Sequence, residues 1–326
     1  MSLLDRVRAL LGRDAVLEDT GAPDGVPRVA PASPDAVALL LGTAREEGWR
    51  VRLEGAGTWM PADAPADLAL TTRRLDRIPS IQPQDLAATA EAGIGCDQLR
   101  QQLADHGVWL ALDPPGLAGR TLGSVVATAT AGPLRHGLGA VRDHLVGVTF
   151  VTGDGRLIQS GGRVMKNVAG SAALVAAEEA GLRTATGGRF AALRADEAHA
   201  FWMRAAEVFA TRPVTFRLGG LPDSSDDLLD LVQHQVGDEW VSASPSVGTL
   251  RWGGETTVER LRHLRRTLAA QEVPLTVERA PWPLRRAVGH FGAYREGVGP
   301  LVAGLRQTFD PASAIAVAVE SDDRVG

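Results

Sequence analysis

A run of small residues follows directly after a predicted strand and is suited to binding an anion. In "RVRLEGAGTWM" the alternating stretch predicts a strand, and the residues after it are Gly55, Ala56, Gly57, Thr58 and Trp59. Small residues let consecutive backbone N–H groups close on an anion, and a threonine hydroxyl can donate to the same oxygens. The spacing is neither that of Walker A nor that of G-x-G-x-x-G. Taken alone, a tight turn at the strand exit explains these residues as well.

A second group of small residues lies in "TLGSVVATATAGP", which predicts a short helix and a loop. Its candidate binding residues are Thr121, Gly123, Ser124, Ala131 and Gly132. A helix this rich in Ala, Thr and Gly lets a flat ligand or a neighbouring backbone come close. Dense packing of the helix on a sheet is therefore an equal alternative.

A third segment, "GGRVMKNVAG", combines glycines with Lys166, Asn167 and Gly170. This grouping is typical of a backbone that approaches a polar ligand. A solvated surface turn is the more common explanation of such a Lys–Asn pair when nothing else accompanies it.

Charge and cysteine content exclude several classes of site. The chain of 326 residues carries 34 basic and 39 acidic side chains, interspersed, which gives no basic footprint for nucleic acid. Cys96 is the only cysteine, so the chain has no internal disulfide and no cysteine-rich zinc or iron–sulfur site. "AGIGCDQL" predicts that this thiol is buried where a helix begins. The histidines show no metal-ligand spacing and no G-x-S-x-G occurs, so we assign no metal and no catalytic residue.

The N-terminal residues predict a short amphipathic helix with charges throughout. They lack the apolar run and the small-residue cleavage site of a signal peptide. No later stretch reaches the ~20 apolar residues of a membrane span. We therefore expect a cytoplasmic protein with no integral membrane segment.

The elements that position these segments predict an α+β fold in two parts. Helix "SPDAVALLLGTAREEGW" begins with Ser33 as its cap, and the strand pair "VGVTFVT" and "RLIQSG" is joined by a Gly153-Asp154-Gly155 turn. After about residue 195 the order becomes strand, helix, strand, strand, helix, strand, which is the ferredoxin-like order. We expect domains at 1–195 and 196–326, the second with a C-terminal tail.

The order of these segments resembles that of a known family. "GAGTWMPADAPADLALTTRRLDRI", "TLGSVVATATAGPLRHGLGAVRDHLVGVTFVTGDG" and "GGRVMKNVAG" are similar to the FAD-binding domain of the vanillyl-alcohol oxidase/p-cresol methylhydroxylase superfamily. The likeness covers roughly residues 25 to 170 and is greatest to the smaller FAD-binding subunits of bacterial glycolate oxidases. The resemblance implies a two-subdomain p-cresol methylhydroxylase-type FAD-binding domain followed by a small ferredoxin-like α+β cap domain.

The resemblance also assigns roles to the three segments. Residues 55–59 would hold the FAD diphosphate, residues 121–132 would line the diphosphate and the flavin, and residues 161–170 would approach the cofactor. Backbone amides can bind such an anion without a buried cation. The implied function is the FAD-binding subunit of a glycolate-oxidase-like complex that oxidises a small 2-hydroxy acid. Its partners would be a larger flavin subunit and an iron–sulfur subunit, which could hold it peripherally at the inner membrane.

Departures from the family pattern support an alternative. Ser124 stands where the family's "TxGG" has its second glycine, and Ser171-Ala172 replaces the usual Tyr-Asp. The usual Asn-Pro-Gly near the C-terminus is replaced by "AIAVAVES". The alternative is a homologue that has lost or weakened FAD binding and serves as a scaffold subunit of such a complex. A stand-alone oxidase acting on another small substrate is a third interpretation.

Overall fold

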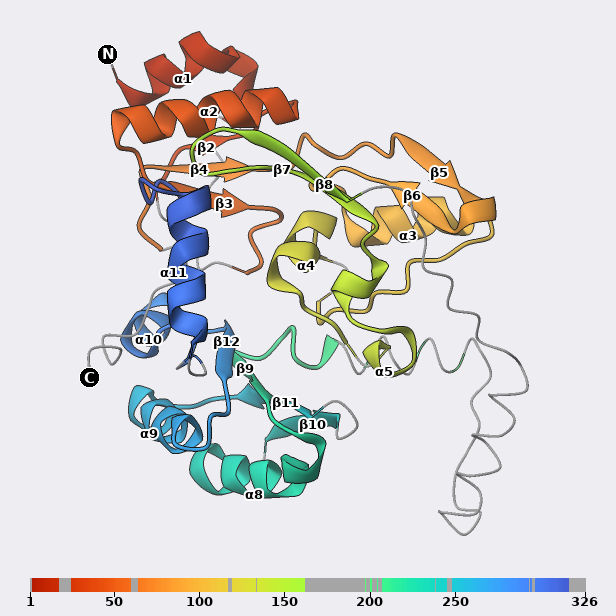
Figure 1. Cartoon of the computed structure of the whole chain (residues 1–326), viewed down its shortest axis with the longest axis vertical. Coiled ribbons are helices and arrows are strands. Elements are labelled where there is room, and N and C mark those ends of the chain that lie inside the picture. Colours follow the sequence, from red (N-terminus) through yellow and green to blue (C-terminus); the bar gives the residue numbers. More distant parts are fainter. Residues whose placement is uncertain are drawn as a thin grey trace.

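The computed structural model describes most of the chain as two four-stranded sheets with helices and two hairpins (Figure 1). The described residues are 2–17, 25–59, 64–116, 119–132, 134–161, 197, 200, 204, 207–237, 239–244, 248–292, 294 and 297–316. The predicted mixed helix-and-sheet fold is confirmed. The predicted boundary at residue 195 lies outside the described residues and stays a prediction.

The first sheet is built from short strands covered by two helices. Its strand order is β1-β2-β4-β3, and both β2 and β3 run parallel to β4. The strands are β1 (Val16–Leu17), β2 (Arg28–Val29), β3 (Val51–Glu54) and β4 (Leu68–Thr71). The helices α1 (Leu3–Leu11) and α2 (Pro34–Glu47) lie on one side of this sheet (Figure 1). Their apolar faces and the strands form a common core that includes Leu40, Leu41, Val51, Leu68 and Leu70.

Local sequence signals fix the ends of α2. The Ser33 side chain accepts a hydrogen bond from the Ala36 N–H at 3.2 Å, so the predicted cap is confirmed. Pro34 occupies the first helical position, where its missing N–H is harmless. The helix ends at Gly48, which takes the left-handed conformation that glycine adopts at lowest cost.

Between residues 80 and 161, the described part of the chain forms two hairpins and three short helices. The hairpins are β5 (Ser80–Gln82) with β6 (Ala87–Thr89), and β7 (Gly147–Val151) with β8 (Leu157–Gly161). The second is the hairpin predicted from its Gly-Asp-Gly turn. The helices are α3 (Cys96–Ala104), α4 (Leu122–Thr128) and α5 (Arg135–Leu138). Cys96 is buried at the start of α3, as predicted, and burial raises the pKa of its thiol to about 11.

The second sheet has the predicted ferredoxin-like topology. Its four strands are antiparallel in the order β10-β11-β9-β12. They are β9 (Val214–Gly219), β10 (Trp240–Ser244), β11 (Thr249–Gly254) and β12 (Leu275–Arg279). The helices α8 (Ser225–Val236) and α9 (Val258–Ala269) pack on one face, and their core is separate from that of the first sheet. A stacked pair, Phe216 and Trp252, lies within it with ring centroids 5.1 Å apart.

The chain then returns to the first sheet. After α10 (Trp282–Val288), helix α11 (Val298–Phe309) runs back toward β3 (Figure 1). The Val51 N–H donates to the Ala314 carbonyl at 2.7 Å, and the Ala316 N–H donates to the Val51 carbonyl at 2.8 Å. The end of the described chain therefore adds a short parallel pairing to the edge of β3.

Short 3₁₀ turns complete the described elements. They lie at Arg13–Ala15, Pro83–Asp85, Val141–His144 and Pro222–Ser224. No helix in the described ranges combines the length and apolarity that crossing a bilayer requires. No cluster of three or more His, Cys, Asp or Glu side chains arranged for a metal ion occurs in the same ranges.

Candidate functional site

Residues 55–59, which we call the anion loop, leave β3 with their backbone amides available. Among the described residues, no acceptor is bonded to the backbone N–H of residues 55–58. Gly57 has φ +73°, and a Cβ at this position would meet nothing within 4 Å. The loop is tied to the sheet at one point, where the Thr71 hydroxyl donates to the Gly55 carbonyl at 3.1 Å. A cradle of free N–H groups beside open space is suited to an anion.

The anion loop meets the second predicted segment directly. A Cβ on Gly55 would collide with the Thr121 side chain, so the two segments touch where only glycine fits. Thr121 is the N-cap of α4, and its hydroxyl accepts a hydrogen bond from the Ser124 N–H at 3.4 Å. The structure thus brings two segments together that lie more than sixty residues apart in the sequence.

Two glycines of the second segment are explained by packing of the chain on itself. The Gly123 N–H donates to the Ala92 carbonyl at 2.8 Å, and a Cβ on Gly123 would lie 2.8 Å from that same oxygen. A Cβ on Gly132 would collide with the backbone of Asp113. Close backbone packing, the alternative to a ligand contact, therefore accounts for both glycines. Their contact with a cofactor stays a prediction.

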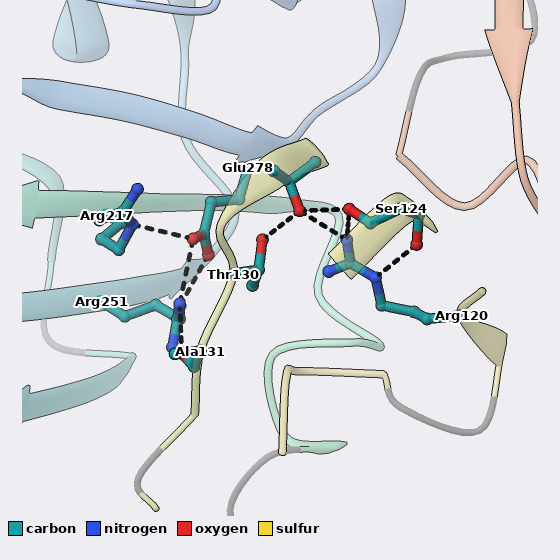
Figure 2. Close-up of polar contacts among 8 residues, drawn as sticks. Arg120, Ser124, Thr130, Ala131, Arg217, Arg251 and Glu278 are labelled. Atoms are coloured by element: carbon teal, nitrogen blue, oxygen red, sulfur yellow. Dashed lines mark hydrogen bonds and ion pairs between the residues drawn. The ribbon is translucent and has the colours of Figure 1, made fainter. Parts of the chain in front are cut away.

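Ser124, the departure from the family's glycine, is engaged by a buried arginine (Figure 2). Arg120 is only 5% exposed, and its Nε donates to the Ser124 hydroxyl at 3.3 Å. Its Nη2 donates to the Ser124 carbonyl at 3.1 Å and to the Thr128 hydroxyl at 2.9 Å. The guanidinium lies 5.2 Å from the centre of the Trp59 ring, a cation–π distance. Helix α4 and the anion loop therefore hold this guanidinium from two sides.

A buried carboxylate lies on the second sheet, facing α4 (Figure 2). Glu278 on β12 accepts from Arg251 at 2.6 and 3.0 Å and from Arg217 at 3.2 Å. Burial pushes the pKa of this carboxyl up, but Arg251 and Arg217 outweigh it and hold the pKa below its usual value. Arg251 also donates to the Ala131 carbonyl at 3.3 Å. One ion-pair cluster therefore spans three strands and reaches the segment after α4.

A second buried arginine ties the anion loop to the other half of the chain. Arg285 on α10 is 1% exposed and donates to the Trp59 carbonyl at 3.1 Å and to the Glu278 carbonyl at 3.0 Å. Burial lowers the pKa of Arg285 to about 10. Beside it, the buried His290 ring meets the Trp59 ring edge-on at 5.6 Å. Trp59 is thus contacted at its carbonyl by Arg285 of α10 and at its ring by His290, which follows that helix.

A cavity of about 320 Å³ lies between the anion loop and the second sheet. The side chains lining it that matter to its chemistry are Thr58, Trp59, Arg120, Thr130, Thr215 and Glu278. Small-molecule sites are concave, start at about 300 Å³ and often lie between domains. The cavity therefore has the place and the size of a small-ligand site.

Sequence reasoning found part of this site. The anion loop and residues 121–132 were predicted, and the structure brings them together, whereas Lys166, Asn167 and Gly170 lie outside the described residues. Arg120, Glu278 and Arg285 were missed. Arg120 directly precedes the predicted segment and could have been included on that ground. Glu278 and Arg285 lie in stretches whose pattern shows only a strand and a helix.

The described residues fit the diphosphate of the predicted cofactor. FAD presents two phosphates, which need several donors at close range. The anion loop offers the Thr58 hydroxyl and N–H groups to which no described residue is bonded, with open space beside Gly57. Because backbone amides supply the donors, no cation has to be buried against the phosphates.

Comparisons with known proteins identify similar sequences and a similar fold. Residues 27–161 match the model of a family described as "FAD binding domain". The chain is 38% identical over 94 residues to the glycolate oxidase subunit GlcE of Escherichia coli (strain K12), covering 28% of this chain and 27% of that protein. It is 25% identical over 166 residues to the glycolate oxidase subunit GlcD of Bacillus subtilis (strain 168), covering 50% and 35%. It is 29% identical over 168 residues to a D-lactate dehydrogenase of Archaeoglobus fulgidus, covering 48% and 37%.

The matched segments span well under half the length of these curated relatives. Among solved structures, an alkyldihydroxyacetonephosphate synthase superposes with a TM-score of 0.60 over 96% of this chain and 85% of that one. The two sequences are 12% identical, so this likeness shows the shared fold and no more.

Proposed function

We propose that this chain, whose residues 27–161 belong to the FAD binding domain family, is the FAD-binding subunit of a complex that oxidises a small 2-hydroxy acid. The proposal starts from the family match and its cofactor, FAD. It adds the substrate class, small 2-hydroxy acids, and the membership of a multi-subunit complex. Supporting them are the similarities to glycolate oxidase subunits and to a D-lactate dehydrogenase, all named for small 2-hydroxy acids.

The observation that carries the proposal is the cavity beside the anion loop. Trp59 belongs both to the loop that fits the FAD diphosphate and to the wall of the cavity. The opposite wall comes from β9 and β12 of the second sheet, through Thr215 and Glu278. A small substrate in this cavity would therefore lie between the cofactor domain and a cap, where oxidation by a bound cofactor requires it.

Each part of the site has a distinct task in this mechanism. When bound, FAD supplies the hydride acceptor. The anion loop holds the diphosphate, and Arg285 fixes that loop through the Trp59 carbonyl. The second sheet forms one wall of the cavity, where Thr215 and Glu278 are buried. We assign no base, because the Glu278 carboxylate is already engaged by two arginines.

The proposal includes partner subunits. A larger flavin subunit and an iron–sulfur subunit would receive the electrons, an arrangement suggested by the resemblance to glycolate oxidase subunits. In this arrangement the chain is cytoplasmic and approaches the inner membrane only through those partners.

A second candidate function is a scaffold subunit that has weakened or lost FAD. The observation that favours it is that Gly123 and Gly132 are explained by contacts with the chain itself and require no cofactor. Ser124, in place of the family's glycine, is likewise used internally by Arg120.

Titration of the purified chain with FAD separates the two candidates. An FAD excess of about 100-fold over the dissociation constant adds about 2.7 kcal/mol to the free energy of unfolding, which is readily seen as a rise in Tm. A yellow protein with this shift supports the cofactor-binding subunit. A colourless protein whose Tm does not rise when FAD is added supports the scaffold function. Glycolate-dependent reduction of an artificial acceptor should then need the partner subunits, and turnover by the isolated chain would contradict the proposed complex.

A further inference from the structure

Arg120 is a buried cation whose hydrogen bonds all go to neutral groups. Its Nε and Nη2 donate to the Ser124 hydroxyl, the Ser124 carbonyl and the Thr128 hydroxyl. Its remaining nitrogen, Nη1, makes no hydrogen bond within the part of the chain that the structure describes. No described Asp or Glu forms an ion pair with Arg120. The side chain lines the cavity, so its unused donors are available to a ligand there.

The acidic side chains around the cavity balance only part of the positive charge there. Glu278 already receives three hydrogen bonds from Arg251 and Arg217. Glu207 is exposed and forms no ion pair with any described residue. One buried carboxylate thus faces three guanidinium groups. Glu278 attracts Arg120 as well as Arg251 and Arg217, so one carboxylate has to balance three cations. The excess positive charge is costly to bury, and an anion entering the cavity would offset that cost.

The geometry suits a carboxylate. A guanidinium presents paired N–H groups that match the two oxygens of a carboxylate. Arg120 is held in place, because α4 accepts hydrogen bonds from its Nε and Nη2 and the Trp59 ring centre lies 5.2 Å from the guanidinium. The Thr215 hydroxyl also lines the cavity and can donate to a further oxygen. The volume of about 320 Å³ restricts the ligand to a small molecule.

We propose that Arg120 anchors the carboxylate of a small organic acid in this cavity, with Thr128 as a positioning residue. The proposal deepens the proposed function, because it names the residue that recognises the acid. The anchor itself is formed entirely by this chain, so it can be tested with and without FAD.

The test is a calorimetric titration of the full chain with oxalate, a small dicarboxylate that cannot be oxidised as a hydroxy acid. Arg120→Gln should weaken oxalate binding by about tenfold or more, because it removes a charge-assisted contact. Arg120→Lys keeps the charge but loses the planar pair of N–H groups, so it should bind oxalate with intermediate affinity. The matched control is Arg266→Gln, the same charge change at an exposed position on α9, which should bind oxalate like the parent chain.

Each other outcome has a defined meaning. Equal oxalate affinity in the parent and Arg120→Gln, or no oxalate binding at all, overturns the proposal. The proposal is also overturned if Arg120→Gln loses FAD affinity and oxalate competes with FAD in the parent chain. Arg120 would then bind the anionic cofactor and not a separate acid. If the chain does not bind FAD but binds oxalate through Arg120, the carboxylate site is supported and the proposed function is contradicted.

A second variant guards against misfolding of Arg120→Gln. Thr128→Val removes one acceptor of Arg120 and leaves the charge in place. Its oxalate affinity should fall by about threefold, with Tm close to that of the parent. An unchanged affinity in a folded Thr128→Val chain would contradict the positioning role.

Discussion

The Arg285 guanidinium donates a hydrogen bond to the Trp59 carbonyl at 3.1 Å, across 226 positions of the sequence. The same side chain donates to the Glu278 carbonyl at 3.0 Å. One buried arginine thus connects the anion loop with β12 and α10. Because both acceptors are backbone carbonyls, the connection fixes the path of the main chain on each side of the cavity.

Arg285→Met should loosen this connection. Methionine fills much of the same space but leaves two backbone carbonyls without their donor. We expect the free energy of unfolding to fall by about 1–3 kcal/mol, the usual cost of an unsatisfied buried acceptor. FAD affinity should fall as well, by about tenfold, since the loop that holds the diphosphate is less well positioned. Urea unfolding and quenching of flavin fluorescence measure the two effects.

The control for this variant lies next to it. Arg286 belongs to the same helix but is exposed, so Arg286→Met should change neither stability nor FAD affinity appreciably. Equal effects of the two substitutions would show that the contact with Trp59 does not position the loop.

Gly57→Asp should abolish FAD binding. The residue has φ +73°, and its missing Cβ faces open space, so aspartate fits without a clash but places a carboxylate where the diphosphate is expected. Gly57→Asn is the matched control, because asparagine has the same shape, tolerates this backbone conformation and carries no charge. Flavin fluorescence should show retained binding for Asn and none for Asp. Retained FAD in the Asp variant would disprove the assignment of the anion loop.

The elements that were predicted correctly depend on local signals. Ser33 caps α2 because a serine preceding a proline is a strong helix start, and the Gly153-Asp154-Gly155 turn joins β7 to β8. The ferredoxin-like order of β9 to β12 follows from the sequence of strands and helices alone. In each case neighbouring residues carry the information.

The elements that were missed depend on distant residues. Nothing near Ala314 indicates that it will accept a hydrogen bond from Val51 at the edge of the first sheet. The same holds for Arg285, whose helix has no unusual pattern, and for Arg251, which must find Glu278 on another strand. Long-range pairings of this kind are set by how the two halves pack, and a single sequence does not display them.

Glu278→Ala should be one of the most destabilising substitutions in the second sheet. It leaves the buried Arg251, and Arg217 beside it, without a counter-ion, which costs about 3–5 kcal/mol in comparable buried pairs. Replacing both members of the tighter pair, as Arg251→Met with Glu278→Leu, should recover most of that loss. Urea unfolding of the single and double variants measures the difference.

An exposed ion pair supplies the comparison for Glu278. Arg142 and Asp143 lie 3.6 Å apart with side chains 88% and 52% exposed, so Arg142→Ala should change stability by no more than about 0.5 kcal/mol. A Glu278→Ala variant as mild as this control would mean that the cluster contributes little to the fold.

His290 should make the protein less stable as the pH falls below neutrality. The ring is 3% exposed, and burial, followed by the nearby charges of Arg285 and Arg265, lowers its pKa from 6.5 to about 3, against a smaller opposing effect of Glu278. Between those two pH values the His290 imidazole is protonated in the unfolded chain but stays neutral in the folded chain. Stability is therefore complete above pH 6.5 and declines on acidification, by about 2 kcal/mol between pH 7 and pH 5.

His290→Phe should flatten this decline. Phenylalanine keeps an aromatic ring against Trp59 and removes the titrating group, and the His290 Nδ1 has no hydrogen-bond partner in the described chain that would be lost. Urea unfolding at pH 7, 6 and 5 should therefore show a shallower slope for this variant than for the parent. The exposed His263, changed to phenylalanine, is the control and should keep the parent's slope. In the folded protein the pKa of Glu278 lies below its usual value, so its contribution to stability is lost only as the pH falls toward and below the ordinary pKa of a glutamate, which lies under the pH 5–7 range of this measurement. Parallel slopes for His290→Phe and the parent would show that the acid sensitivity arises elsewhere.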